Sequence, residues 1–386
     1  LKPKGLKIFT FNSGFKKKND DLLIILFDEV VNVACKYSLT TMPSAPIIWD
    51  KKNNKGTCKA VIVNSGNANA HTGKRGLQNI DNYASELSKY LKCSIKNILI
   101  SSTGVIGEQL DSKKICNKIK HLPFSTDKTL IDAARSIWTT DTFVKTSILN
   151  LKINNKNIKI YGFGKGSGMV SPNMGTMLAY IFIDCKIPSL KLKKLLTDNI
   201  ESTFNCISVD SDTSTSDTVM LFSNPINKIN LNNNYKKIST GLNKVMKDLS
   251  MQIISDGEGV KKIIKVSVIN AKNQIQAKKI AFSIANSPLV KTAISGEDAN
   301  WGRIVMAIGK TQENIKQEKT IIKFGKNIVA INGQKNKNIN LLKVDQYMKN
   351  QFIDIEVNLS LGKASSIVYG NDLNHEYIRI NADYRS

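Results

Sequence analysis

The sequence predicts a mixed fold of the α/β (α+β) class. Short apolar runs of strand length alternate along the chain with stretches whose apolar residues recur every three to four positions, as in helices that cover a sheet. The longest apolar runs, 22–27 and 177–183, are far shorter than the ~20 residues of a membrane helix, so no membrane partner is expected. The 386 residues predict about two or three domains, or two intertwined halves around a large core.

The first half of the chain holds three predicted strands and one predicted helix. Residues 59–65 contain the run Ala-Val-Ile-Val and lead into a turn rich in Gly and Asn. Residues 78–91 carry apolar side chains at helical spacing. Residues 97–101 form a second apolar strand, which we expect to end in a turn at 103–107, and residues 158–162 form a third.

The second half predicts two further helices and one strand. A helix is expected to begin at Pro188 and Ser189, with its apolar residues on one face. That face would consist of Leu192, Leu195, Leu196, Ile200 and Phe204. Residues 265–270 alternate like a half-buried strand, and 277–285 have helical spacing. The stretches rich in Lys and Asn are expected to be surface loops or hairpin ends: 51–55, 150–159, 227–237 and 310–337.

The net charge of +25 suggests a nucleic acid or another anionic partner when it is taken alone. Only five of the 56 basic residues are arginines, however, and proteins that read bases favour the bidentate guanidinium group. We therefore interpret the lysines as residues of solvated positions and expect no nucleic-acid partner.

The cysteines and histidines give no sign of a metal site or a disulfide framework. None of the six cysteines forms a Cys-x-x-Cys pair, and the three histidines are dispersed. Scattered thiols in a chain of this size are typical of an intracellular protein. We expect no metal and no bound cofactor.

The segment 162–178 is rich in glycine and carries Lys165. Its glycines fit neither the dinucleotide-binding spacing nor a P-loop. Two interpretations stay open. In the first, the segment is a turn that precedes a core strand. In the second, Thr176 is a nucleophile that cuts the chain after Gly175 and thereby gains a free α-amine. An α-amine with a pKa of about 7.7–8.0 could accept the hydroxyl proton, so no histidine would be needed.

A second polar segment, 207–217, contains Asp210 and Asp212 after an apolar run. These carboxylates could serve a Mg²⁺-dependent phosphotransferase with Asp210 as nucleophile, provided that further carboxylates held the metal. The other interpretation is a turn whose Asp and Thr side chains bond to the backbone.

Ten short motifs, taken together and in order, resemble the ArgJ family, the glutamate and ornithine N-acetyltransferases of arginine biosynthesis. They extend from about residue 60 to the end of the chain. The motifs are NSGNANA (64–70), STGVIGE (102–108), TTDT (139–142), KGSGM (165–169), PNMGTML (172–178), SVDSDTST (208–215), DGEG (256–259), SPLVKTA (287–293), NWGR (300–303) and INADY (380–384).

The resemblance implies a fold of layered sheets covered by helices, with an N-terminal threonine nucleophile and two intertwined lobes. It also implies self-cleavage between Gly175 and Thr176 into an α chain (1–175) and a β chain (176–386). An acetyl-enzyme on Thr176 would carry the acetyl group from N2-acetylornithine to glutamate in a ping-pong cycle. The residue before the nucleophile is more often Ala in the family, and Gly175 should still permit cleavage.

The resemblance also implies roles for individual residues. Thr103 and Gly104 would form the oxyanion hole, where one lost donor typically costs about 2.7–4 kcal/mol. Contacts to substrate carry over to Thr139, Lys165, Thr176, Glu258, Asn381 and Ser386, with Thr139 favoured among the threonines of 139–142.

The resemblance finally bears on partners and location. The family usually assembles from two α and two β chains, a heterotetramer. Bifunctional members also use acetyl-CoA, which is therefore a candidate co-substrate. We expect a cytoplasmic enzyme, or one of an organelle matrix if a transit peptide has been removed.

Overall fold

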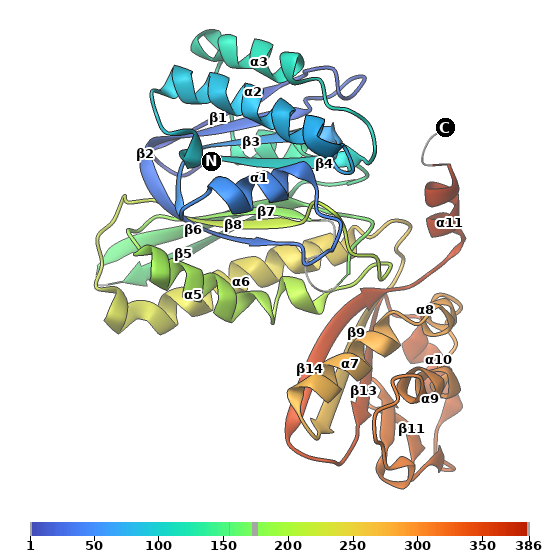
Figure 1. The fold of residues 1–386 in the computed structure, drawn as a ribbon. Coiled ribbons are helices and arrows are strands. Elements are labelled where there is room, and N and C mark those ends of the chain that lie inside the picture. Colours follow the sequence, from blue (N-terminus) through green and yellow to red (C-terminus); the bar gives the residue numbers. More distant parts are fainter. Residues whose placement is uncertain (1, 154, 172–176, 384–386) are drawn as a thin grey trace. The chain divides into compact units, whose positions relative to one another are not determined.

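The computed structural model describes residues 2–153, 155–171 and 177–383, which form two compact units (Figure 1). The first unit comprises Leu1–Met169, Asn173–Asn205 and Thr213–Ile253. The second comprises Val170–Pro172, Cys206–Asp212 and Ile254–Ser386. The chain therefore passes between the units several times before it completes the second, which explains why no linker is visible in the sequence.

The first unit is built on one eight-stranded sheet. The strands follow the order β4-β3-β2-β8-β7-β6-β5, and β1 pairs with β2 outside this path. Their bounds are β1 Leu6–Phe11, β2 Leu22–Tyr37, β3 Thr57–Asn67, β4 Ile98–Val105, β5 Lys145–Ile153, β6 Lys156–Lys165, β7 Leu178–Ile183 and β8 Thr218–Ser223.

The long strand β2 divides this sheet into two stacked halves (Figure 1). Residues before an irregularity between Leu26 and Val31 pair with β1 and β3, and residues from Asn32 onward pair with β8. One buried cluster contains side chains of both halves, among them Val61 and Val63 of β3 with Phe163 and Phe182 of β6 and β7. The two halves therefore pack face to face around a shared apolar core.

Helices cover the outer faces of the two halves, so the first unit has four layers (Figure 1). Three helices, α1 Ala45–Asn53, α2 Gly73–Leu91 and α3 Ser112–Lys120, share a buried cluster with β1 to β4. On the other side lie α5 Ser189–Ile200 and α6 Leu231–Ser255. Shorter pieces are α4 Leu130–Ser136 and the 3₁₀ turns Ile95–Asn97, Leu122–Phe124 and Phe204–Cys206.

The second unit has a six-stranded sheet of order β12-β11-β10-β13-β9-β14. The strands are β9 Ile263–Ala271, β10 Ile321–Phe324, β11 Asn327–Ile331, β12 Gln334–Lys335, β13 Phe352–Asn358 and β14 Ala364–Asn371. The helices are α7 Gln274–Ala285, α8 Pro288–Ser295, α9 Trp301–Gly309, α10 Leu341–Met348 and α11 His375–Ala382, with a 3₁₀ turn at Gln317–Lys319. Apolar residues of α7 to α10 and of the sheet form one buried cluster.

The structure confirms the mixed α/β class and each predicted strand and helix, with five corrections. The stretch 51–55 is not a loop throughout, since α1 continues to Asn53. The stretch 227–237 is not a loop throughout, since α6 begins at Leu231. The stretch 310–337 contains β10 to β12. Phe204 is buried but lies beyond the end of α5, in a 3₁₀ turn. The strand β4 continues through Thr103 and Gly104 to Val105 instead of turning there.

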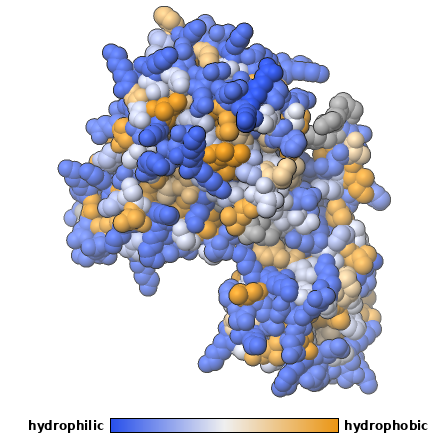
Figure 2. All heavy atoms as spheres, in the orientation of Figure 1, coloured by the Kyte–Doolittle hydropathy of each residue, from blue (hydrophilic) through white to orange (hydrophobic). Residues whose placement is uncertain are grey.

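The surface of the protein is rich in lysine, as the composition indicates. On the face in Figure 2, hydrophilic residues predominate and apolar residues lie in scattered groups. In the part of the chain that the structure describes, four lysines are buried nonetheless: Lys145, Lys165, Lys262 and Lys291. Among the described residues, no helix is long and apolar enough to span a bilayer.

Candidate active site

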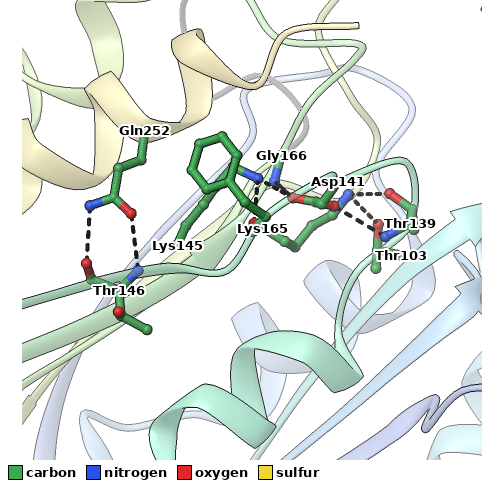
Figure 3. Close-up of polar contacts among 9 residues, drawn as sticks. Thr103, Thr139, Asp141, Lys145, Thr146, Lys165, Gly166 and Gln252 are labelled. Carbon is green, nitrogen blue, oxygen red and sulfur yellow. Dashed lines mark hydrogen bonds and ion pairs between the residues drawn. The ribbon is translucent and has the colours of Figure 1, made fainter.

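Lys165, the last residue of β6, is buried at the centre of a polar cluster in the first unit (Figure 3). Its Nζ donates to the hydroxyl of Thr139 at 2.7 Å and to that of Thr103 at 3.4 Å. Thr103 belongs to β4 in one half of the sheet, and Lys165 belongs to the other half. The face-to-face packing of the two halves therefore unites three of the residues that the sequence analysis selected.

Asp141 holds this cluster together (Figure 3). Its Oδ1 accepts from Lys145 Nζ at 2.7 Å and from the backbone N–H of Gly166 at 2.8 Å. Its Oδ2 accepts from the backbone N–H of Thr139 at 3.1 Å. One carboxylate thus fixes the backbone beside Lys165 and the backbone of Thr139, and so sets the distance between their side chains.

The buried charges of the cluster act on one another. Burial alone would raise the pKa of Asp141, but the ammonium groups of Lys165 and Lys145 outweigh it and hold that pKa below its usual range. Asp141 therefore faces two ammonium groups in a buried setting, where coulombic attraction is stronger than in water.

Thr103 and Gly104 belong to β4, which pairs in parallel with β3. Gly104 has φ +128° and stands opposite Gly66 in the register. A Cβ at Gly104 would come within 2.3 Å of the carbonyl carbon of Gly66. The close approach of the two strands therefore requires glycine at position 104. In addition, the Ser102 hydroxyl donates to Asn64 Oδ1 at 2.5 Å, which ties this end of β4 to β3.

The predicted cleavage residues Gly175 and Thr176 lie outside the described residues. The chain that follows them is described from Met177 onward, and Leu178 pairs directly with Lys165 in the antiparallel ladder β6–β7. The residue two positions after Thr176 is thus a direct neighbour of the lysine at the centre of the cluster.

Two of the predicted substrate contacts lie together in the second unit. Asn381 of α11 donates from Nδ2 to Glu258 Oε2 at 2.9 Å. Glu258 is buried, and Asn381 is exposed. Ser386, the last predicted contact, lies outside the described residues.

Asp210 has contacts that favour the structural interpretation of its segment. Its Oδ1 accepts from the backbone N–H of Val170 at 2.9 Å, and the Tyr377 hydroxyl donates to its Oδ2 at 3.3 Å. Within the residues that the structure describes, no group of three or more His, Cys, Asp and Glu side chains could hold a metal ion.

Sequence reasoning missed Asp141 and Lys145, although both are buried in the cluster. Asp141 lies inside the TTDT motif, but Thr139 was the residue predicted from this motif. Lys145 stands after the apolar residues Phe143 and Val144, at the start of a strand. The signal that could have indicated this buried ion pair is the spacing: an acidic and a basic residue stand four positions apart at the edge of an apolar run.

Comparison with known proteins identifies the family of this chain. The profile of the ArgJ family matches residues 7–386. The arginine biosynthesis bifunctional protein ArgJ of Bartonella henselae is 40% identical over 390 residues, which cover 99% of this chain and 95% of the relative. The protein of the same name from Zymomonas mobilis is 41% identical over 389 residues, with the same coverage.

A solved structure is also similar. The crystal structure of the arginine biosynthesis bifunctional protein ArgJ of Bacillus halodurans is 34% identical, with a TM-score of 0.50. The match covers 54% of this chain and all of that chain. This chain therefore belongs to the ArgJ family of arginine-biosynthesis enzymes.

Proposed function

We propose that this protein transfers an acetyl group from N2-acetylornithine to glutamate through an acetyl-enzyme on Thr176. The observation that carries the proposal is the position of Lys165, which contacts Thr139 and Thr103 and pairs with the strand that follows Thr176. A buried cation, two hydroxyl groups and the start of β7 thus lie within one cluster, where an amino-acid substrate with a carboxylate could bind.

The reaction begins with the cut that releases the α-amine of Thr176. The Thr176 hydroxyl attacks the carbonyl carbon of Gly175, the peptide bond breaks, and water then hydrolyses the resulting ester. The products are an α chain (1–175) that ends in a carboxylate and a β chain (176–386) that begins with Thr176. The ladder between β6 and β7 pairs Ile160–Lys165 with Leu178–Ile183, so it would hold the two chains together after the cut.

In the transfer itself, the Thr176 hydroxyl attacks the acetyl carbonyl of N2-acetylornithine while the α-amine accepts the hydroxyl proton. That proton passes to the leaving nitrogen, and ornithine departs. The amino group of glutamate then attacks the acetyl ester, and Thr176 is regenerated. Backbone N–H groups of Thr103 and Gly104 are our candidates for stabilising the oxyanion in both steps. Glu258, Asn381 and Ser386 stay candidates for substrate contact in the second unit.

Acetyl-CoA is our candidate for a second acetyl donor, because the curated relatives carry the name bifunctional. We further propose an assembly of two α and two β chains and a cytoplasmic location. All six cysteines are free thiols, which fits a reducing compartment.

Denaturing mass spectrometry combined with the Thr176→Ala variant tests the proposal. The wild-type protein should yield two fragments that meet between Gly175 and Thr176, and the variant should yield one intact chain without transferase activity. An intact wild-type chain with full activity, or a Thr176→Ala variant with normal turnover, would contradict it. Replacing N2-acetylornithine by acetyl-CoA in the same assay tests the second donor.

A further inference from the structure

Asp217 lies buried directly before β8 and binds the backbone next to the proposed nucleophile. Its Oδ1 accepts from the backbone N–H of Met177 at 2.8 Å, and its side chain is fully excluded from solvent. Met177 directly follows Thr176 in the sequence. The backbone N–H of Thr218 donates to the Met177 carbonyl at 3.1 Å, so both polar backbone groups of Met177 bind to residues 217 and 218.

The position of Asp217 is itself fixed by the fold of the first unit. Its backbone carbonyl accepts from the N–H of Ser38 at 3.0 Å. The next residue, Thr218, begins β8 and pairs with Leu178 in the parallel ladder β7–β8. Asp217 can therefore act as a rigid support for the start of β7.

The second carboxyl oxygen of Asp217 has an unusual environment. Oδ2, like the rest of the side chain, is buried. Burial raises the pKa of Asp217 well above its usual range, while the Met177 N–H, the charge of Lys165 and nearby Ser214 act in the opposite direction.

We propose that Asp217 is a positioning residue for Thr176, which holds the peptide group that follows the nucleophile and thereby fixes where the hydroxyl is presented. This inference rests on the proposed function, because Asp217 acts on the reaction through Met177. Accurate placement matters, since a displacement of about 1 Å at a reacting group can cost about 100-fold in rate.

The test compares two substitutions at Asp217, which contacts the start of β7, with a control at the other end of β7. Asp217→Ala removes the acceptor for the Met177 N–H, whereas Asp217→Asn keeps a carbonyl oxygen in its place. Asp184, the control, follows the last residue of β7 and is also buried. Its Oδ1 accepts from the side-chain amide of Asn224 at 3.3 Å, so Asp184→Ala likewise removes a buried acceptor.

For Asp217→Ala we expect slower self-cleavage and a kcat for acetyl transfer that is lower by about 100-fold, with the KM for N2-acetylornithine nearly unchanged. Asp217→Asn should restore most of the kcat, and Asp184→Ala should keep it. A wild-type kcat in Asp217→Ala would overturn the inference. An equal loss in Asp184→Ala, or no rescue by Asn, would do the same.

A second measurement needs no variant and covers the case in which Asp217→Ala does not fold. Hydrogen exchange in the wild-type protein should be slow at the Met177 amide, and fast exchange there would overturn the inference. The proposed function is tested separately. An active Thr176→Ala variant would refute that function, whereas an inactive Thr176→Ala variant together with a fully active Asp217→Ala variant would refute only the role of Asp217.

Discussion

Two buried lysines, one in each unit, satisfy their ammonium groups in different ways. Lys291 of α8 donates to the carbonyl oxygen of Val209 at 2.8 Å and to both the backbone and the side-chain oxygen of Asn371. Lys165 donates to the hydroxyl groups of Thr139 and Thr103. Each lysine is almost fully excluded from solvent.

The difference between the acceptors separates a structural lysine from a binding one. A carbonyl oxygen can only accept hydrogen bonds, so the three acceptors of Lys291 use it to join segments of the second unit. A hydroxyl that accepts from a lysine can still donate its own proton to a ligand. Lys165 and its two threonines therefore form a set of groups that can receive an anionic substrate without losing their mutual contacts.

The largest expected effect, on kcat/KM, comes from removing the ammonium group of Lys165, with removal of the ammonium group of Lys291 as the comparison. Lys165→Met should lower kcat/KM for acetyl transfer by about 100-fold or more, because a charge-assisted contact to substrate and two hydroxyl partners are lost. Lys291→Met should lower the free energy of unfolding by about 1–3 kcal/mol through unpaired carbonyl groups. Its kcat/KM per folded molecule should stay near the wild-type value. Steady-state kinetics and denaturant unfolding of both variants measure these effects. If both variants lost the same kcat/KM and the same stability, the distinction between a binding and a structural lysine would be refuted.

Asp141→Asn is expected to have the next largest effect, on stability. It leaves Lys145 and Lys165 buried without their carboxylate, and breaking a buried ion pair typically costs about 3–5 kcal/mol. The double variant Asp141→Asn/Lys145→Met should regain part of this loss, because one of the two unpaired charges is gone. Urea unfolding measures both values. A double variant less stable than Asp141→Asn alone would contradict the role of Asp141 as the shared partner.

Thr139→Val tests whether the hydroxyl acceptor distinguishes Lys165 from Lys291. The variant keeps the shape of the side chain but removes the partner at 2.7 Å from Lys165 Nζ. Loss of a hydrogen bond to a charged group is worth about 1.5–3 kcal/mol, so kcat/KM should fall by about 10–100-fold. Thr139→Ser, which retains the hydroxyl, should stay close to the wild type. A Ser variant as impaired as the Val variant would show that the methyl group matters instead.

The smallest effect concerns pH. The pKa of Asp141 lies below its usual range in the folded protein, so its contribution to stability is complete above the unfolded-state pKa of about 3.9. That contribution is lost as the pH falls through the lower, folded-state pKa. The difference in unfolding free energy between the wild type and Asp141→Asn should therefore be constant from pH ~7 to ~5 and should narrow below. A difference that shrinks already near neutral pH would contradict a lowered pKa of Asp141.

The sequence predicts the fold class and those elements whose apolar residues show a clear local pattern, among them β3, which contains the run Ala-Val-Ile-Val. The helix α6 was not predicted, and its start at Leu231 lies in a stretch that was expected to be a loop. There, Asn232, Asn233 and Asn234 dilute the apolar spacing. The bounds of the two units were not predicted either, because the second unit takes its residues from three separate segments, and periodicity describes only neighbours in the chain.

The candidate site was predictable only in part, for a related reason. Lys165 and Thr103 are 62 residues apart, and no local pattern indicates that the two halves of the sheet bring them together. Their selection came from the family resemblance. Asp141 binds the backbone N–H of Gly166, directly after β6, and Asp217 binds that of Met177, directly before β7. Both contacts join segments that are distant in the sequence, so they are visible only in the folded chain.

The most direct test of the account is to trap the acetyl-enzyme. The purified protein is incubated with N2-acetylornithine in the absence of glutamate, and its fragments are then analysed by mass spectrometry under denaturing conditions. We predict the mass of one added acetyl group on the hydroxyl of Thr176 at the start of the β chain, and its loss when glutamate is added. An acetyl group on any other residue, or turnover without an acetylated Thr176, would contradict the account.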